Sequence, residues 1–445
     1  MGLKDLQLEL TQNRILPVLS SLLPKDGPCY LVGGAVRDAL QNRPSRDYDF
    51  TTPYDPSDLA RGLAQALEGA WFMLDEPRRQ SRVVAGQGAS RWCCDFAPFR
   101  ADGLDGDLQR RDFTINAMAL PLQADAMLGG LYDPLGGFDD LQRGLLRSCS
   151  GRVLHDDPLR VLKGLRHCLY LHLSIDPSTL IAMRQAATSL SRVAPERIRS
   201  ELAALLAFEP ARDALLWLQE LGLLNLLLPV SADTALGDAG FSLLDRAEAW
   251  MSFLRCADGS RWLNDFFAKE LEQGVSNAIA FKLAAWFHGQ NPGEAEALTG
   301  LQKLRFSRAL QRAVSCLLNL DRSQAEQLHD LPSACRSRAL WAEGLGSHPQ
   351  LALCFLGLLT DVPFGEVAKP LLSILDALRQ SEVKGRVPHL VSGSWLQNTL
   401  RLRGAEIGSY LAALRREEIA GRVLNQLQAE QFLLRLQQMG GQKND

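Results

Sequence analysis

Two glycines near the N-terminus stand where a bound phosphate would need them. The segment LVGGAVRD at residues 31–38 has the pattern of a short apolar strand that runs into Gly33 and Gly34 and then into a helix. Glycines at such a turn allow backbone N–H groups and a helix start to approach an anion, because no side chain intervenes. Arg37, one turn into the helix, adds a cation that could contact the phosphates. The pattern predicts a phosphate-binding turn.

Two aspartates follow in the segment RDYDF, which alternates like a strand. Asp47 and Asp49 are two residues apart, so both carboxylates project from one face of that strand. Carboxylate oxygens suit Mg²⁺, which keeps water and substrate phosphates as its other ligands. Two metal ions would stabilise both the attacking and the leaving oxygen of a phosphoryl transfer. The alternative is a solvated strand edge, and the neighbouring glycine turn and Arg37 argue against it.

The segment RRDFTINA at residues 110–117 places two arginines beside an aspartate. Arg111 and its neighbours could clamp a triphosphate through charge-assisted hydrogen bonds. The apolar residues that follow suggest that the segment continues into the core. A surface RRD at the start of a helix remains the alternative.

The segment DDPLR at residues 156–160 begins a stretch with helical periodicity. Asp157 and Arg160 lie three apart at its start and therefore share a face. A carboxylate acceptor beside a guanidinium donor could pair with the edge of a nucleobase. The same two side chains could equally form a salt bridge at the helix N-terminus.

The elements that must position these residues differ along the chain. Up to about residue 150 the chain predicts short strands separated by turns, at 29–32, 47–52, 82–85 and 92–96. From about residue 157 it predicts mainly helical segments. They lie at 159–173, after Pro195, and at 201–228, 240–257, 262–287, 294–319, 349–360 and 367–380. A breaker stretch at 384–393 precedes a last helical segment at 406–439. Strands first and helices afterwards indicate an α+β head with an all-helical body.

The amino-acid composition indicates the broad class of protein. The 445 residues, 46% hydrophobic and 22% charged, indicate an ordinary globular protein of two to four domains and exclude disordered, collagenous and disulfide-scaffold classes. Nine cysteines without a CxxC pair predict reduced thiols rather than a disulfide framework or a zinc cage. The start MGLKDLQLEL is charged within four residues, and no apolar run is long enough to span a bilayer. We therefore expect no signal peptide, no membrane partner and a cytoplasmic location.

Charge is segregated along the chain although the total is only −3. Residues 201–300 hold 14 acidic and 6 basic side chains, a net of −8. Residues 301–340 hold 7 basic and 3 acidic side chains, and residues 379–422 hold 8 and 4, a net of +4 in each. Segregated charge can steer a polyanion onto one part of a surface. Solvated helix faces are the alternative.

Four motifs in order, LVGGAVRD with RDYDF, RRDFTINAMAL, DPLGGFDDLQRGLLRS and DDPLRVLKGLRH, resemble class II tRNA nucleotidyltransferases. This group and the bacterial poly(A) polymerases belong to the DNA polymerase β-like nucleotidyltransferases. The helix at 194–202 and the tail SGSWLQN…GAEIGSYLAALRREEIAGRV are also similar, whereas residues 230–380 contain no motif that we can place. The resemblance implies a nucleotidyltransferase head with a mixed sheet at 1–150, followed by a helical base-reading neck at 151–230, a helical body at 231–380 and a helical tRNA-binding tail at 381–445.

The resemblance also implies an activity and its residues. The activity is template-independent addition of CMP, AMP or both, from CTP and ATP, to the 3′ end of tRNA with Mg²⁺, in a two-metal site. The implied residues are Gly33, Gly34 and Arg37 for the triphosphate, Asp47 and Asp49 for the metals, Asp95 as a third catalytic carboxylate, Arg111 and Asp112 for the nucleotide, and Asp157, Arg160 and Lys163 for the base. Asp156 replaces the glutamate of the common EDxxR form, and Lys163 stands where many relatives have arginine, which cannot be exchanged freely for lysine. Asp95 could instead be a surface or capping residue.

RNA contacts are expected on the basic segments. Lys/Arg side chains dominate binding to a nucleic-acid backbone, so Arg305, Arg308 and Arg312 are the predicted contacts to tRNA phosphates. No obligate protein partner is evident. A non-catalytic RNA-binding helical protein with a vestigial head would predict loss of the carboxylate pair, and both carboxylates are present. A small-molecule nucleotidyltransferase such as an aminoglycoside-modifying enzyme fits the DxD alone.

The sequence leaves open which nucleotides are added to the RNA 3′ end. A poly(A) polymerase is disfavoured, because the chain is slightly acidic and ends in GGQKND. Only 14 residues, 96–109, separate the strand that contains Asp95 from the RRD motif, whereas CCA-adding relatives usually have a longer loop there. A short loop predicts addition of CC only, with a separate A-adding enzyme as partner. Complete CCA addition, or addition of A only, remains the alternative.

Overall fold

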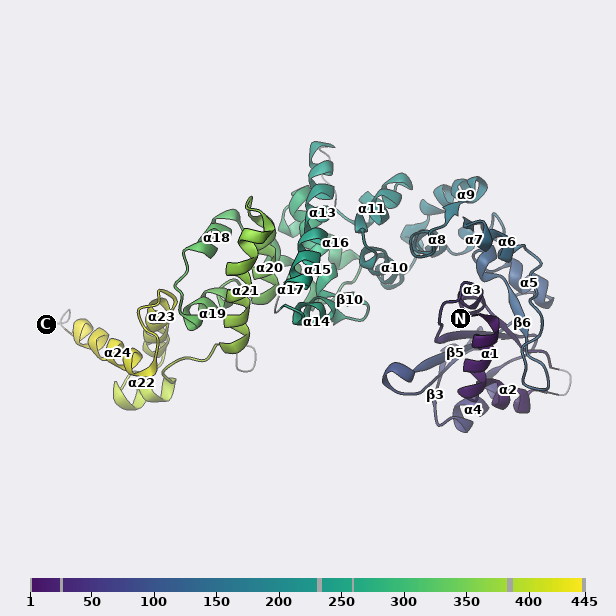
Figure 1. The fold of residues 1–445 in the computed structure, drawn as a ribbon, viewed down its shortest axis with the longest axis horizontal. Helices are drawn as coiled ribbons and strands as arrows, with labels where there is room; N and C mark the ends of the chain where they lie inside the picture. The colour runs from purple at the N-terminus through teal and green to yellow at the C-terminus, as the bar shows by residue number, and fades with distance from the viewer. Residues whose placement is uncertain (1, 25–26, 230–233, 258–259, 382–386, 442–445) are drawn as a thin grey trace. The chain divides into compact units, whose positions relative to one another are not determined.

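The computed structural model describes residues 2–24, 27–229, 234–257, 260–381 and 387–441 (Figure 1). The chain forms two compact units. Unit 1 comprises Met1–Glu201 and Glu220–Gly222, and unit 2 comprises Leu202–Gln219 and Leu223–Asp445. Unit 1 contains a mixed sheet and the rest is mostly helical, which confirms the predicted α+β class. The finer division at residues 150, 230 and 380 stays a prediction.

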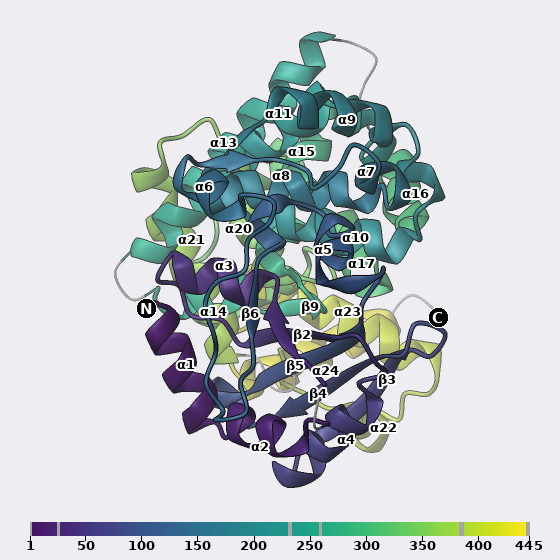
Figure 2. The same cartoon turned by 90° about the vertical axis from the view of Figure 1, so that its right-hand side faces the viewer.

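Six strands form the mixed sheet of unit 1 in the order β3–β4–β5–β2–β1–β6 (Figure 2). Their bounds are β1 Tyr30–Val32, β2 Asp47–Thr52, β3 Ala70–Asp75, β4 Gln80–Ala85, β5 Trp92–Pro98 and β6 Ala119–Pro121. β2 and β5 are parallel, and all other neighbours are antiparallel. The four predicted strands are confirmed, whereas the sequence did not predict β3 or β6. β3 has five apolar residues in a row, so the period of two that marks a strand is hidden.

The two faces of this sheet differ at β3, β4 and β5. On one face Val83, Cys94 and Phe96 are buried, and helix α4 covers the edge with Arg61 over the ring of Trp71 at 4.8 Å. Residues of the opposite face alternate with these and are half-exposed or exposed. The predicted catalytic strands therefore have one closed face and one open face.

Helices accompany the sheet in unit 1 and make up most of the remaining chain. In unit 1 they are α1 Leu3–Gln12, α2 Ile15–Leu22, α3 Gly34–Leu40, α4 Ser57–Ala66, α5 Gly103–Gln109, α6 Gly137–Gln142, α7 Val153–Asp156, α8 Leu159–Leu171 and α9 Pro177–Ala187, and α10 Pro195–Ala207 crosses into unit 2. Two short strands, β7 Leu145–Leu146 and β8 Ser174–Ile175, pair in parallel. The predicted helix at 159–173 is confirmed as α8, which ends where His172 takes a left-handed conformation (φ 55°).

Unit 2 is built almost entirely from helices. They are α11 Ala211–Glu220, α12 Leu224–Leu227, α13 Thr234–Cys256, α14 Trp262–Ala268, α15 Asn277–Gln290, α16 Glu294–Lys303, α17 Arg308–Leu318, α18 Arg322–Glu326, α19 Cys335–Glu343, α20 Pro349–Leu359, α21 Phe364–Ser381, α22 Gly393–Thr399, α23 Ala405–Ile419 and α24 Gln426–Gly441. The predicted helical segment 262–287 contains two helices, α14 and α15, rather than continuous helix. A hairpin of β9 Glu270–Glu272 and β10 Val275–Ser276 interrupts it, because Gly274 adopts a positive φ of 73° that no helix tolerates.

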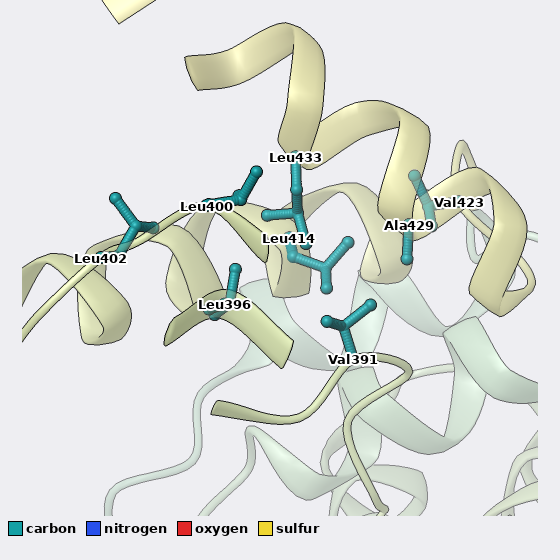
Figure 3. Packing of buried hydrophobic residues seen from close by; sticks show 8 residues of the cluster. All are labelled: Val391, Leu396, Leu400, Leu402, Leu414, Val423, Ala429 and Leu433. Carbon is teal, nitrogen blue, oxygen red and sulfur yellow. The ribbon is translucent and has the colours of Figure 1, made fainter. Parts of the chain in front are cut away.

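The last three helices enclose a small core of their own. Its buried residues are Val391, Leu396, Leu400, Leu402, Leu414, Val423, Ala429 and Leu433 (Figure 3). α23 packs on α19, where the Ser337 hydroxyl donates to the Glu418 carbonyl at 2.6 Å and Arg336 pairs with the Glu418 carboxylate at 3.1 Å. The first residues of the predicted breaker stretch, 384–386, lie outside the described residues.

Two expectations about the whole chain can be compared with the structure. All nine cysteines lie in the described part and all are free thiols, as predicted. Within the described residues, no helix combines the length and apolar character needed to cross a bilayer.

Candidate active site

One cavity of about 1490 Å³ in unit 1 collects the predicted site residues of the head and neck. Its lining includes Gly33, Gly34, Arg37, Asp47, Asp49, Asp95, Arg111, Asp112, Asp157, Arg160 and Lys163. Ten arginines and one lysine line it against seven aspartates. The cavity therefore combines a surplus of cations with a carboxylate cluster, which is the electrostatic requirement for a metal–triphosphate ligand.

The glycine turn and the aspartate strand meet at the floor of this cavity. Gly33 has a φ of 79°, and a Cβ built on it would lie 2.7 Å from Oδ2 of Asp49, so only glycine fits there. Val32 of β1 stands directly opposite Asp49 of β2 in the sheet register. The backbone of the turn thus lies against the carboxylate that is predicted to bind metal.

Asp49 is poorly solvated and Asp47 is exposed. Burial raises the pKa of Asp49, and the positive charge of Arg111 only partly opposes this shift. A buried carboxylate with a raised pKa gains when a divalent cation arrives, because the cation favours the ionised form. The donor set of two carboxylates on one strand face therefore fits Mg²⁺ that takes its remaining ligands from phosphates and water. A ready-made cluster of three His, Cys, Asp or Glu side chains is not found among the described residues.

Asp95 lies beside the pair, and both of its oxygens have partners. It stands opposite Asp49 in the parallel β2–β5 register, and its charge contributes to the raised pKa of Asp49. Arg82 of β4 donates from Nε and Nη2 to the two oxygens of Asp95, each at 2.7 Å. The sequence did not identify Arg82, because it precedes its partner by 13 residues on another strand.

A buried hydrogen-bond network joins the glycine helix to the RRD motif. The Arg37 guanidinium donates to Oδ1 of Asn116 at 2.5 Å, and the Asn116 amide donates to Oδ1 of Asp112 at 3.0 Å. The same amide lies 3.3 Å from Nε2 of His167 in α8. Asn116 and His167 were missed by sequence reasoning, although both stand inside the segments that were singled out.

Lys163 supplies the charge that this network needs. Its Nζ lies 3.8 Å from Oδ2 of Asp112. Burial would by itself raise the pKa of Asp112, but the Lys163 charge and the hydrogen bonds from Asn116 and the Phe113 amide lower it overall. Burial and the nearby Arg37 lower the pKa of His167, so its imidazole stays neutral. Asp112, with its lowered pKa, thus lies at the junction of the RRD motif and helix α8.

Arg111 is oriented by the helix that precedes it. Asp107 in α5, 1% exposed, accepts from Nη2 of Arg111 at 3.0 Å and from the Arg100 amide at 3.0 Å. The other terminal nitrogen of Arg111 lies 3.6 Å from the position of a Cβ on Gly33. Helix α5, which forms half of the short 96–109 segment, therefore directs Arg111 toward the glycine turn.

Asp157 and Arg160 line the cavity but have different partners. Arg197 of α10 donates to Oδ2 of Asp157 at 2.8 Å. The Arg160 guanidinium donates to the backbone carbonyls of Val153 at 3.2 Å and Arg111 at 3.5 Å. Asp157 thus pairs with Arg197 rather than with Arg160, and the Arg160 contact to the RRD backbone links neck to head. Their role toward a base remains a prediction.

The predicted RNA-binding arginines lie in unit 2. Arg305 follows α16, Arg308 begins α17, and Arg312 lies one turn later, all three exposed. A cation in the first turn of a helix is disfavoured by the helix dipole, by about 0.3 to 1 kcal/mol. Helix stability therefore does not account for Arg308.

Family models match two parts of the chain. The model described as poly A polymerase head domain matches residues 29–147, and the one described as probable RNA and SrmB-binding site of polymerase A matches residues 172–234. The first region holds the sheet, the glycine turn and the three aspartates. These matches define the fold class as that of a nucleotidyltransferase head followed by a helical extension.

Proteins with similar sequences identify the family within this class. A CC-adding tRNA nucleotidyltransferase of Geobacter sulfurreducens is 32% identical over 437 residues, which is 95% of each chain. An A-adding tRNA nucleotidyltransferase of Deinococcus radiodurans is 43% identical over 221 residues, 48% of each chain. The chain belongs to the class II tRNA nucleotidyltransferase family, as its motifs predicted.

Solved structures agree on the fold. The Thermotoga maritima CCA-adding enzyme complexed with tRNA superposes with a TM-score of 0.67 at 21% identity, and the alignment covers 98% of both chains. A CCA-adding enzyme in complex with ATP gives a TM-score of 0.69 at 21% identity and the same coverage. The arrangement of a mixed-sheet head and helical remainder is therefore shared along nearly the whole chain.

Proposed function

We propose that this protein transfers CMP, AMP or both from CTP and ATP to the 3′ end of tRNA and releases pyrophosphate. The observation that carries the proposal is the single cavity that contains the carboxylates of β2, the glycine turn, Arg111 and the first turn of α8. A reacting nucleotide needs these four features at once, for metal, phosphates and base. The full-length similarity to a CC-adding tRNA nucleotidyltransferase supports the same substrates.

Asp47 and Asp49 are the proposed ligands of Mg²⁺. The ion, when bound, supplies charge neutralisation to the triphosphate and to the attacking and leaving oxygens. Gly33 and Gly34 admit the phosphates close to the backbone, and Arg111, oriented by Asp107, contacts them. The 3′-hydroxyl oxygen then bonds to the α-phosphorus as the bond to pyrophosphate breaks.

Asp95 is proposed as the third carboxylate, with Arg82 as its partner. Its register opposite Asp49 places it on the strand next to the metal ligands. The bidentate contact with Arg82 orients both oxygens of the Asp95 carboxylate. A carboxylate in this place can bind metal or accept the hydroxyl proton.

Asp157 and Arg160 are proposed to select the base. Arg197 and the Val153 carbonyl hold the two side chains at the cavity wall, so little rotamer freedom is lost when a base binds. A buried polar site rejects a mismatched base because its groups are left without partners. Lys163, close to Asp112, is proposed to support this wall rather than to stack on the base.

The decisive experiment follows the products on a tRNA that ends at the discriminator base. The protein is incubated with Mg²⁺ and with CTP, ATP or both, and the RNA 3′ ends are sequenced. Addition of C, A or both at the 3′ end supports the proposal, and RNA of unchanged length under all conditions contradicts it. Omission of Mg²⁺ is expected to abolish addition.

A second candidate, addition of CC only, is favoured by the short 96–109 segment. Accepting CTP twice and then ATP requires two arrangements of the base-reading residues with different affinities. Seven of these 14 residues form α5, whose Asp107 is occupied by Arg111, which leaves little free loop to drive such a change. Products that stop two residues longer when both nucleotides are present support CC addition, and CCA ends contradict it.

A further inference from the structure

The sheet face that contains the predicted catalytic aspartates continues to the edge of the sheet. Phe72 of β3 stands opposite Arg82, Arg82 opposite Asp95, and Asp95 opposite Asp49. Directly opposed residues point to the same face of a sheet. One row of side chains therefore runs from Asp49 to Phe72, across three strand spacings or about 14 Å.

This row ends in exposed apolar side chains. Phe72 is 50% exposed, and Leu74, which lies at a register shift in the β3–β4 pairing, is 51% exposed. Their neighbour Trp71 points to the opposite face, where Arg61 of α4 lies over it. A large aromatic ring in water, next to a covered one on the same strand, indicates a surface that is kept open for a ligand.

The open face is continuous with the active-site cavity and contains basic groups. Pro77, Arg78, Arg79 and Gln80, the turn between β3 and β4 and the start of β4, line that cavity. The side chains of Arg78 and Arg79 are 75% and 63% exposed, and each pairs with a surface aspartate, at 3.7 Å and 2.9 Å respectively. The hairpin thus presents an aromatic ring on its face and two guanidinium groups at its tip, which suits a ligand with flat bases and phosphates.

We infer that the open face of β3 and β4, with Phe72 at its centre, binds the unpaired 3′ end of the RNA substrate. The inference rests on the proposed function, because the 3′-hydroxyl must reach Asp49 from some direction. Aromatic rings on open sheet faces bind single-stranded RNA by stacking on its bases. Phe72 stacks on a base a few nucleotides from the reacting end, and Arg78 and Arg79 lie along the phosphates.

The test uses the full-length protein and an RNA acceptor-stem hairpin with 2-aminopurine in its unpaired 3′ end. Stacking quenches this base, so both affinity and quenching are measured. Phe72→Ala is expected to weaken RNA binding about tenfold and to abolish quenching, since stacking contributes about 1 to 3 kcal/mol per base. The KM for CTP stays unchanged. Phe72→Trp is expected to retain RNA affinity and quenching. Phe72→Leu keeps the apolar area without the aromatic ring and is expected to lose both.

Leu8→Ala is the matched control, because Leu8 of α1 is a similarly exposed apolar side chain of the head outside this face. It is expected to bind RNA like the wild type. Unchanged binding and quenching in Phe72→Ala would overturn the inference, as would an equal loss in Leu8→Ala. A change in the sedimentation of the free protein in Phe72→Ala, with unchanged RNA binding, would make the face a self-association surface and overturn it too.

The RNA-binding role of Phe72 and the proposed nucleotidyl transfer can each be refuted without the other. Wild-type protein that extends tRNA while Phe72→Ala behaves like wild type refutes the role of Phe72 and leaves the proposed function intact. Wild-type protein that quenches the RNA probe in a Phe72-dependent manner but transfers no nucleotide supports the RNA-binding face and refutes the proposed function.

Discussion

Both units bury charged side chains, and among the described residues those of unit 1 line a cavity whereas Lys282 of unit 2 is enclosed by acceptors. In unit 2, Lys282 is 1% exposed, and its ammonium lies 2.7 Å from the Glu248 carboxylate. The same ammonium donates to the backbone carbonyls of Leu206 at 3.1 Å and Phe208 at 3.2 Å. Three donors thus meet three acceptors, and the group has no capacity left for a ligand.

Unit 1 arranges its buried charges differently. Asp112 is held by Asn116, the Phe113 amide and Lys163, yet Lys163 itself is 41% exposed at the cavity wall. Arg111 is anchored on one side by Asp107, and its other terminal nitrogen lies near the glycine turn. A closed charge network contributes to stability, whereas a network open on one side positions groups for a ligand. Variants in the two units should therefore separate activity from stability.

The largest expected effect is on activity in unit 1. Asp49→Asn is expected to lower nucleotide addition to tRNA by about a thousandfold, since it removes the charge of a proposed metal ligand. Its melting temperature without metal should stay equal or rise, because burial raises the pKa of Asp49 and its ionised form does not stabilise the fold. Asp58→Asn, at an exposed α4 position, is the control with normal addition.

Two other outcomes for Asp49→Asn would contradict this comparison of the two units. An Asp49→Asn protein that extends tRNA normally would remove Asp49 from the active site. One that is inactive because it unfolds would make the cavity floor a structural site.

The next effect is on stability in unit 2. Lys282→Met is expected to lower the free energy of unfolding by about 3 kcal/mol, because the buried Glu248 carboxylate loses its counter-charge and two backbone carbonyls lose the ammonium donor. Denaturant unfolding measures this loss. Nucleotide addition per folded molecule should be unchanged at a temperature where the variant is folded. Lys269→Met, at an exposed position directly after α14, should change neither quantity, and a similar loss in both variants would contradict the closed-network interpretation.

A selective effect is expected at Arg160, which is proposed to select the base. Arg160→Ala should reduce the rate of CMP addition by about 10- to 100-fold and reduce the preference for CTP over UTP, because a polar partner of the base is lost. Competition between the two nucleotides in one reaction measures the preference. Arg143→Ala, exposed at the end of α6, should leave both quantities unchanged. An unaltered preference in Arg160→Ala would tell against base selection by this residue.

A smaller effect is expected from the basic surface of unit 2. Changing Arg305, Arg308 and Arg312 together to Gln should weaken tRNA binding about tenfold at low salt and lower the slope of log affinity against log salt by about 2 to 3. Filter binding over a salt series measures both quantities.

The control for this triple variant removes the same charge from unit 1. Changing Lys4, Arg61 and Arg143 to Gln should leave the salt slope nearly unchanged. If both triple variants behave alike, tRNA responds to net charge rather than to this helix surface.

The smallest effect concerns pH. The pKa of Asp112 is lowered in the folded protein, so its contribution to stability is present above its unfolded pKa of about 3.9 and is lost as pH falls through the folded pKa. Lys163→Met raises that folded pKa and should cost about 1 kcal/mol near neutral pH. The cost should disappear on acidification, when Asp112 is protonated in the variant and in the wild type. Lys163→Arg should show no such dependence, and a pH-independent loss in Lys163→Met would contradict the assignment.

The sequence by itself determined the chemistry-bearing motifs and the order of element types. The glycine turn, the two aspartates of β2, the RRD motif and the DxxR helix start are each local patterns, so spacing alone identified them. All of them line one cavity. The strands and helices that present them were also predicted, since each has a clear period or a terminal signal. β3 was missed because its apolar run has no period, and Gly274 was not recognised as the turn that interrupts a helix.

Only the tertiary structure decided the partners of these motifs. Arg82 holds Asp95 across 13 residues, Arg197 holds Asp157 across 40, and Asn116 binds Arg37 across 79. No local period or propensity encodes such pairs. They arise because strand register and helix packing bring distant side chains within hydrogen-bond distance, where burial requires every polar group to be satisfied. The same register, rather than any motif, aligned exposed Phe72 with the sheet face that contains Asp49 and Asp95.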